Sequence, residues 1–276
     1  MIILHGGENS VERLKSLQTP KHELTEFFPK RNKYCIGIPV INEGEKIRKQ
    51  LARLKRYSQI VDILIFDGGS VDGSLDHGFL RSKKIRALLV KKEKGKQGTQ
   101  LRIGCAYALK EGYKGIILMD GNNKDSLEPI SRFIKALDEG YGYVQGSRFI
   151  PGGKHKNTPL SRILGIRLVH APLMSLAAGK WYTDTTNGFR ALSREYLLDR
   201  RLDIFRDEFI SYEFYFYTTI SANRLGHKTK EIPVTRVYPK GQIPTKINGI
   251  VGNIKFLMTT IGVALGKYKN KAIKSG

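Results

Sequence analysis

Short apolar segments alternate with helical patterns along the first half of the chain, and this alternation constrains the fold more than any other feature. The segments "YCIGIPV" (34–40) and "VDILIFD" (61–67) are apolar runs that end at turn-forming or acidic residues, as buried parallel strands do. Between them Ile47, Leu51 and Leu54 recur at helical spacing. Together these segments predict a βαβ unit.

The same alternation continues further along the chain. Strands are predicted at 85–90, 115–120 and 141–149, and helices are predicted at 101–109 and 130–137. This pattern predicts an α/β fold with a Rossmann-like, mostly parallel sheet and helices on both faces. Ligands of such sheets bind beyond the carboxyl ends of the strands.

The second half of the chain is less regular. We expect a helix at 159–179 with an interruption at Pro172, and a loop at "TDTTNGFR" (183–190). The aromatic stretch 211–226 is either a helix or a strand, because its periodicity favours neither.

At the C-terminus, apolar residues recur at steps of three and four and are followed by lysines, which predicts an amphipathic helix. The apolar positions are Ile247, Ile250, Val251, Ile254, Leu257, Met258 and Ile261, and the lysines are Lys267, Lys269, Lys271 and Lys274. We therefore expect an N-terminal extension (1–32), a main domain (33–246) and a C-terminal amphipathic helix with a basic tail (247–276).

The chain of 276 residues carries 48 Lys and Arg against 25 Asp and Glu, a formal net charge of +23. This excess predicts an anionic partner: nucleic acid, a phosphorylated small molecule or an acidic membrane face. No helix-turn-helix, zinc-finger or RRM signature accompanies the charge, so we expect no nucleic-acid binding.

Two further expectations concern the compartment and the membrane. Cys35 and Cys105 lie in apolar runs without CxxC spacing and are interpreted as buried thiols in a reducing compartment. We expect no signal peptide, because Glu8 follows the start too closely. We also expect no membrane-spanning segment, since the apolar run from Phe256 is about half of the roughly 20 residues that span a bilayer.

Polar side chains follow the first two predicted strands. Pro39, Asn42 and Glu43 stand at the end of the first, and Asp67 and Asp72 stand in a glycine-rich turn after the second. Such groups, with the amides of a following helix, suit a nucleoside, a ribose or a phosphate. A helix cap and a tight turn explain the same residues without a ligand, so both interpretations stay open.

Two later segments suit a diphosphate and a cation. The lysine-rich segment "KKEKGKQGTQLRIG" (91–104) leads into a helix and makes Lys96 and Arg102 candidate donor ligands, with a solvated loop as the alternative. In "GIILMDGNNKD", Asp120 and Asn122 have the spacing of a DXD motif, which directs two oxygens to one cation. Mg²⁺ and Mn²⁺ prefer such ligands, and an ordinary polar turn is the alternative.

Two arginines are candidates for phosphate or carboxylate recognition. Arg148 stands beyond a predicted strand in "QGSRF", and "TDTTNGFR" places Asp184, Asn187 and Arg190 around a glycine. A structural ion pair between Asp184 and Arg190 is the alternative.

Six segments in this order resemble glycosyltransferase family 2, in its dolichyl-phosphate mannose synthase-like branch. They are "IPVINE", "DILIFDGGSVDGS", "GTQLRIGCAYAL", "IILMDGN", "GSRFIPGG" and "TDTTNGFRALSRE". The resemblance covers roughly 34–246 and implies a GT-A fold. It also implies inverting transfer from a nucleoside diphosphate sugar, with UDP or GDP as the nucleotide.

The resemblance implies roles for particular residues. Asp120 and Asn122 would hold Mg²⁺ or Mn²⁺. The nucleoside pocket would be lined by Pro39, Asn42, Glu43 and Asp67, to which we add Asp72, Lys96 and Arg102 as donor-binding candidates. The catalytic candidates are Asp120, Arg148, Asp184 and Arg190, and the candidates for the acceptor phosphate are Arg148, Arg167 and Lys246.

The chain departs from the family pattern at several positions. Asp67 is followed by glycine where the family has a second aspartate, Asn122 replaces the second metal aspartate, and Lys124 stands where many relatives have glutamine. One carboxylate fewer and one ammonium more predict weaker metal binding, with Lys124 or Asp125 compensating. The QxxRW motif of other members is absent, since the only tryptophan is Trp181.

Two acceptors fit this pattern. A polyprenyl phosphate is already ionised near neutral pH and attacks the anomeric carbon without a strong general base. A sugar hydroxyl, as in polysaccharide or glycoconjugate synthesis, needs a base, for which Asp184 and Glu213 are the candidates.

We favour the polyprenyl phosphate at the cytoplasmic face of a membrane. The C-terminal helix would then lie peripherally in the interface, with its lysines on anionic lipid. In the alternative, the apolar face of this helix packs on the protein's own core.

Overall fold

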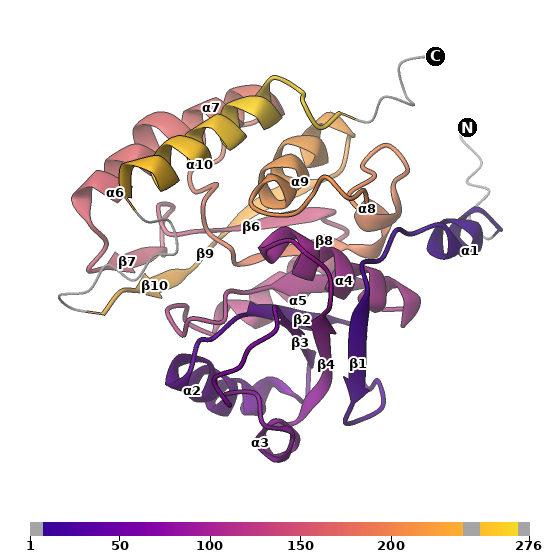
Figure 1. The fold of residues 1–276 in the computed structure, drawn as a ribbon. Coiled ribbons are helices and arrows are strands. Elements are labelled where there is room, and N and C mark those ends of the chain that lie inside the picture. Colours follow the sequence, from indigo (N-terminus) through magenta and orange to yellow (C-terminus); the bar gives the residue numbers. More distant parts are fainter. Residues whose placement is uncertain (1–7, 240–248, 270–276) are drawn as a thin grey trace.

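The computed structural model describes residues 8–239 and 249–269. Its main sheet has eight strands in the order β1-β4-β3-β2-β5-β8-β6-β9 (Figure 1). In chain order they are β1 (His22–Glu26), β2 (Cys35–Val40), β3 (Asp62–Asp67), β4 (Ile85–Lys91), β5 (Gly115–Leu118), β6 (Tyr143–Ser147), β8 (Arg190–Ser193) and β9 (Thr229–Pro233). The mostly parallel sheet is therefore confirmed.

The strand directions divide the sheet into parallel and antiparallel parts. β2, β3, β4 and β5 pair in parallel, and so do β6 and β9. β8 runs antiparallel to both β5 and β6, and β1 runs antiparallel to β4. Three strands of this sheet were not predicted: β1 comes from the N-terminal segment, β8 begins at Arg190 inside the predicted loop, and β9 follows the aromatic stretch 211–226.

Helices cover both faces of the sheet (Figure 1). One face packs against α2 (Glu45–Leu54), α3 (His77–Ser82) and α5 (Pro129–Asp138), and the other packs against α4 (Gln97–Lys110), α8 (Arg194–Leu198) and α9 (Glu213–Arg224). Strands β2, β3 and β5 are buried along their whole length, which explains why they read as continuous apolar runs. The stretch left undecided between helix and strand is thus the helix α9.

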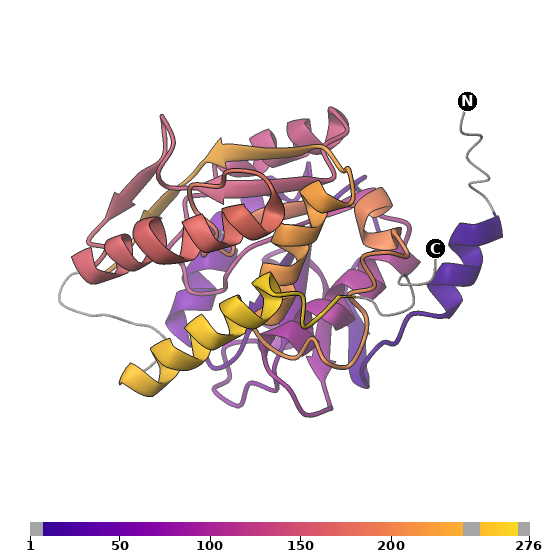
Figure 2. The same cartoon turned by 90° about the horizontal axis from the view of Figure 1, so that it is seen from above.

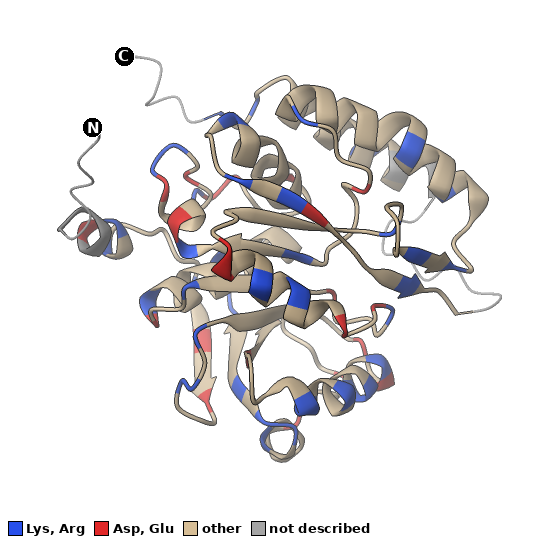
Figure 3. Ribbon diagram, turned by 180° about the vertical axis from the view of Figure 1, so that it is seen from behind, with Lys and Arg blue, Asp and Glu red and all other residues tan. Residues whose placement is uncertain are grey.

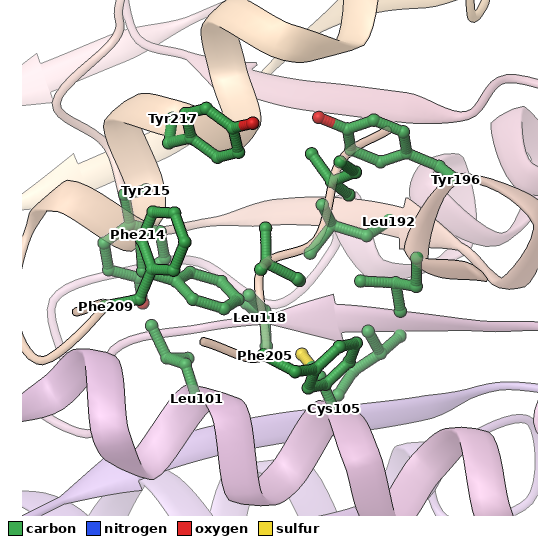
Figure 4. Packing of buried hydrophobic residues seen from close by; sticks show 14 of the residues in the cluster. Leu101, Cys105, Leu118, Leu192, Tyr196, Phe205, Phe209, Phe214, Tyr215 and Tyr217 are labelled. Atoms are coloured by element: carbon green, nitrogen blue, oxygen red, sulfur yellow. The ribbon is translucent and has the colours of Figure 1, made fainter. Parts of the chain in front are cut away.

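The side chains of each strand alternate between two apolar cores. Ile36 and Ile38 of β2 face the core under α2 and α5, whereas Cys35 faces the core under α4 and α9. Figure 4 shows the second core, where residues of α4 meet Phe205 and Phe209 from the segment before α9. Both cysteines are free and buried, as predicted, and burial raises the pKa of both thiols.

A helical stretch from α6 (Leu160–Leu164) through the π-helix η2 (Gly165–His170) to α7 (Ala171–Ala178) lies on the outer side of α9. α10 (Gly249–Ala264) contacts both α7 and α9, and Figures 1 and 2 show it beside α6 and α7. The expected interruption at Pro172 is not found. The wider π turn precedes the proline, and Pro172 sits in the first turn of α7, where a helix tolerates proline.

The stretch Leu160–Ala178 is long and apolar enough to span a membrane by length and composition, with a mean hydropathy of 1.2. The sequence-based expectation of no such segment overlooked it. In the structure, 33% of the stretch is buried inside the protein. Because helices of soluble proteins pass the same test, this finding by itself places nothing in a membrane.

Smaller elements complete the described part. They are α1 (Glu8–Lys15), the 3-10 helix η1 (Lys55–Tyr57) and a two-stranded parallel sheet of β7 (Lys154–Lys156) and β10 (Thr235–Val237). Lysines and arginines are spread over many elements, including several turns of α2 (Figure 3).

Candidate active site

Two loops beyond the carboxyl ends of β2 and β3 are joined by hydrogen bonds. The backbone N–H of Asn42 donates to the Ser70 hydroxyl at 3.0 Å, and the Asn42 side-chain oxygen accepts from the N–H of Val71 at 2.9 Å. The Asp72 carboxylate accepts from the N–H of Gly44 at 2.8 Å. The structure therefore brings Asn42 and Asp72 together, as the sequence predicted from their places at neighbouring strand ends.

Three more of the predicted donor-binding residues lie at this edge. Both carboxylate oxygens of Asp67, at the end of β3, accept from the N–H of Ser70 at 3.0 Å, so this side chain shapes the turn. Pro39 is buried within β2, and Glu43 follows in the first loop. Their part in binding a donor stays a prediction.

The helix α4 begins beside these loops. Lys96 precedes it and is exposed, and its backbone N–H donates to the carbonyl of Ile210 at 2.9 Å. On the sheet side of α4, the buried amide of Gln100 donates to the carbonyls of Val40 (2.7 Å) and Phe66 (2.6 Å). Gln100 therefore fixes the two strand ends, a role that no sequence pattern indicated.

Arg102 is not brought to this edge. Its buried guanidinium donates to the carbonyl of Phe205 at 2.7 Å and to the carboxylate of Asp207 at 2.5 Å. Because Arg102 follows Gln100 by two residues on a helix, its side chain lies on another side of α4. It supports the segment between α8 and α9.

Asp120 lies in the loop after β5, and its carboxylate has a partner that the sequence did not suggest. Arg236 of β10 donates to Asp120 at 2.9 Å and to Asp125 at 2.6 Å. Burial raises the pKa of Asp120, but Arg236 outweighs this effect and leaves the pKa below its usual value. Burial also raises the pKa of Asp125, and there Arg236 offsets only part of the shift.

Lys124 belongs to the same cluster. Its side chain is buried, and the ammonium lies 4.9 Å from the centre of the Tyr238 ring. Burial lowers the pKa of Lys124, and the neighbouring Arg236 lowers it further. The backbone N–H of Lys124 donates to the side-chain oxygen of Asn122 at 3.3 Å.

Two other elements hold the Asp120 loop in place. From α2, the Gln50 amide donates to the carbonyl of Asp120 at 2.8 Å and accepts from the N–H of Asn123 at 2.6 Å. Asn123 has a φ of 57°, a left-handed conformation that asparagine tolerates. From the other side, Gly188 approaches so closely that an added Cβ would lie 2.5 Å from the Asp120 carboxylate.

Arg148 and Asp184 form a buried, bidentate ion pair. The Arg148 side chain donates to Asp184 at 2.6 and 2.9 Å, and the Arg148 backbone N–H donates at 3.1 Å. The two side chains are only 2% and 0% exposed. Burial raises the pKa of Asp184, but Arg148 more than offsets it, so the pKa lies below its usual value.

The alternative interpretation, an ion pair between Asp184 and Arg190, is therefore wrong, because Asp184 pairs with Arg148 instead. Arg190 is buried and donates to the carbonyls of Asn187 (2.6 Å) and Tyr215 (3.1 Å). These bonds place Arg190 in the protein interior beneath the loop.

The remaining candidates lie apart from this cluster. The carboxylate of Glu213 accepts from the N–H of Ile210 at 2.6 Å and from the N–H of Ser211, at the start of α9. Arg167 is exposed on η2, with its guanidinium 5.8 Å from the ring centre of Phe149. Lys246 lies outside the described residues.

These contacts decide how well a divalent cation fits. Across residues 8–239 and 249–269, no group of three or more His, Cys, Asp or Glu side chains could hold a metal ion. Asp120 and Asp125 both accept from Arg236, and Asn122 offers a neutral oxygen that already accepts a backbone N–H. The residues present do not fit a tight Mg²⁺ or Mn²⁺ site.

The chain resembles known proteins in sequence and in fold. Residues 35–200 match the family model for glycosyl transferase family 2. The chain is 30% identical to the undecaprenyl-phosphate mannosyltransferase of Micrococcus luteus over 82% of this chain and 93% of that protein. It is 29% identical to the polyprenol monophosphomannose synthase of Mycolicibacterium smegmatis over 72% of this chain and 75% of that protein.

Solved structures share the fold. A structure of glucosyl-3-phosphoglycerate synthase from Mycobacterium tuberculosis, in complex with Mg²⁺ and UDP, superposes with a TM-score of 0.58 over 95% of this chain and 84% of that chain. The sequence identity is 13%, so this likeness concerns the fold alone. It confirms the predicted GT-A architecture.

Proposed function

Because the chain belongs to glycosyl transferase family 2, and is thus a glycosyltransferase, we propose that it transfers a sugar from a nucleoside diphosphate sugar to a polyprenyl phosphate at the cytoplasmic face of a membrane. This choice of acceptor rests on one observation: both carboxylates that could act as a general base are already engaged in hydrogen bonds within the protein. Asp184 is locked in an ion pair with Arg148, and Glu213 accepts two backbone N–H groups. Neither carboxylate is placed to take a proton from a sugar hydroxyl.

A phosphate acceptor removes the need for such a base. Its oxygen is ionised near neutral pH and attacks the anomeric carbon in line, so the protein has to position the two substrates and stabilise the departing diphosphate. The names of the two relatives, an undecaprenyl-phosphate mannosyltransferase and a polyprenol monophosphomannose synthase, support the same class of acceptor.

An exposed apolar surface on the outer helices supports contact with a membrane. Its exposed members are Leu160, Leu164, Leu168, Val169 and Leu176 on α6, η2 and α7, and Ile254, Leu257 and Met258 on α10. If the apolar face of the C-terminal helix packed on the protein's own core, the alternative considered above, Ile254, Leu257 and Met258 would be buried. Instead, Phe256 and Val263 pack against the core, Ile254, Leu257 and Met258 are exposed, and Ile261 is half-buried. The other three members of the predicted stripe, Ile247, Ile250 and Val251, lie outside the described side chains.

The charge around this surface favours anionic lipid as its occupant. Exposed basic side chains accompany the apolar residues, namely Arg167 on η2, Lys255 on α10, and Lys267 and Lys269 directly after α10. Apolar helices flanked by lysines bind at the interface of anionic membranes, where each basic residue contributes about 1 kcal/mol. A polyprenyl phosphate in that membrane would lie next to the domain.

The donor would bind at the carboxyl edge of β2, β3 and β5. Asn42, Asp67 and Asp72 frame the place for the nucleoside, and Asp120 lies at the end of β5, where we place the diphosphate. The nucleotide of the donor is either UDP or GDP. Mg²⁺ or Mn²⁺ that accompanies the donor would meet only Asp120 and the amide oxygen of Asn122, and so would bind weakly.

A product assay tests this proposal. The protein is incubated with a panel of radiolabelled UDP and GDP sugars and vesicles that contain polyprenyl phosphate, and the label is followed into the organic phase. We expect organic-extractable label that mild acid releases, because the product is a glycosyl phosphate. Label that appears only on an added glycan, and never in the organic phase, would overturn the proposal.

A further inference from the structure

Two acidic and two basic side chains form one cluster at the end of β5, in which Asp125, Lys124 and Arg236 are buried and Asp120 is 22% exposed. Arg236 bonds to Asp120 at 2.9 Å and to Asp125 at 2.6 Å, and its side chain is 8% exposed. Lys124 is 9% exposed and lies beside β10, since its carbonyl accepts from the N–H of Val237 at 2.9 Å. The Lys124 ammonium and the Arg236 guanidinium lie 4.9 and 5.8 Å from the centre of the same Tyr238 ring. Three of these side chains belong to the loop after β5, and Arg236 belongs to β10. An isolated backbone bridge between Asp125 and Arg236 joins the loop to β10.

The formal charges of this cluster sum to zero, as in a pair of carboxylates that holds a divalent cation. Here the two positive charges come from Arg236 and Lys124, both fixed to the chain. A guanidinium is always charged and recognises phosphate oxygens with a planar set of donors. Arg236 donates from Nη1 to Asp125 and from Nη2 to Asp120, so the two carboxylates hold its guanidinium in a fixed position.

An open pocket adjoins the cluster. Its lining includes three lysines and one carboxylate, namely Glu45, Lys46 and Lys49 of α2 and Lys124, together with Asn122 and Tyr238. Three lysines around one pocket at a strand end suit a ligand with two or more negative charges.

We propose that Arg236 and Lys124 take the place of the divalent cation, so that this chain binds a nucleoside diphosphate without a metal. The inference rests on the proposed function, because it concerns the donor of that reaction. The diphosphate meets the fixed positive charges of Arg236 and Lys124, while Asp120 and Asp125 hold Arg236 in position. Metal ions then contribute little to donor affinity.

The test is calorimetric titration of UDP and of GDP into the intact protein, in excess EDTA and in excess MnCl₂. We expect the dissociation constant of the nucleotide that binds to agree within about threefold between the two conditions. Binding that weakens by about tenfold or more in EDTA would overturn the inference and leave the proposed function intact. Absence of binding in both conditions would overturn both.

Two variants assign the effect to the cluster. Lys124→Gln should weaken binding in EDTA by roughly tenfold or more, the cost of one charge-assisted contact. Added Mn²⁺ should restore part of the affinity of this variant. Lys110→Gln, at an exposed position at the end of α4, is the control and should bind like wild type.

Arg236→Lys keeps the positive charge next to the two carboxylates and so avoids an uncompensated buried Asp125. It should weaken binding less than Lys124→Gln weakens it. If Lys124→Gln and wild type bound the nucleotide equally well in EDTA, Lys124 would not contribute to diphosphate binding, and the inference would be wrong for this residue. Stoichiometric Mn²⁺ binding by the wild type without nucleotide, seen as loss of the free Mn²⁺ resonance signal, would also contradict the inference.

Discussion

Replacement of Asp184 by asparagine tests whether the buried Arg148–Asp184 pair is structural. Asp184 accepts three hydrogen bonds from Arg148, at 2.6, 2.9 and 3.1 Å, and is fully buried. The variant keeps the shape of the side chain but leaves the Arg148 guanidinium, 2% exposed, without its counter-charge.

The size of the effect follows from that burial. Breaking a buried ion pair by removing one charge costs about 3–5 kcal/mol, because the other charge remains desolvated. Native domains are stable by only about 5–15 kcal/mol, so the variant loses a large share of its stability. For a chain of 276 residues, a loss of this size lowers the melting temperature by roughly 5 to 9 °C.

Urea unfolding at neutral pH measures this loss. The matched control is Glu139→Gln, which removes one partner of the exposed Lys230–Glu139 pair and should change the unfolding free energy by less than about 1 kcal/mol. The reasoning fails if Asp184→Asn unfolds like wild type and yet loses glycosyl transfer. That result would indicate a general base, and it would favour a hydroxyl acceptor.

Three further outcomes follow from the structure. Burial lowers the pKa of His170 from 6.5 to about 4, so neutral His170 stabilises the fold fully above pH 6.5, and this stabilisation is lost as the pH falls to 4. Across that range, the unfolding free energy of wild type should fall by about 3 kcal/mol more than that of His170→Gln in urea titrations. Equal losses would refute the assignment. Gly104→Ala places a Cβ 2.0 Å from a phenylalanine ring of β3 and should cost at least about 1–3 kcal/mol in thermal melts, whereas an unchanged melt would contradict the close approach of α4. Leu168→Glu combined with Leu176→Glu should reduce recovery with anionic vesicles by at least about tenfold, Leu24→Glu on β1 should not, and equal recovery of all three proteins would contradict the membrane surface.

The parallel strands could be predicted because burial on both faces leaves a local mark in the sequence. β2 and β3 consist of continuous apolar runs, and α2 between them shows its apolar face at helical spacing. β8 has only four residues and lies antiparallel between two strands, so its place depends on partners distant in sequence. β1 is an edge strand with largely exposed side chains, and polar edge strands carry no apolar alternation.

The candidate site shows the same division. Asp120 could be found because it follows an apolar strand within a recognisable motif. Its partner Arg236 could not, since 116 residues separate the two and nothing around Arg236 marks it. The 36 residues between Arg148 and Asp184 likewise hid their pairing, and the predicted partner, Arg190, stood nearer in sequence.

The acceptor is the central claim, and release of nucleoside diphosphate measures it most directly. With a nucleotide sugar that the protein uses, release is followed as polyprenyl phosphate or the phosphate-free polyprenol is added in vesicles. We predict one nucleoside diphosphate released for each polyprenyl phosphate consumed, and none above background with polyprenol. Equal release with both lipids, or release that requires only a glycan, would contradict the account.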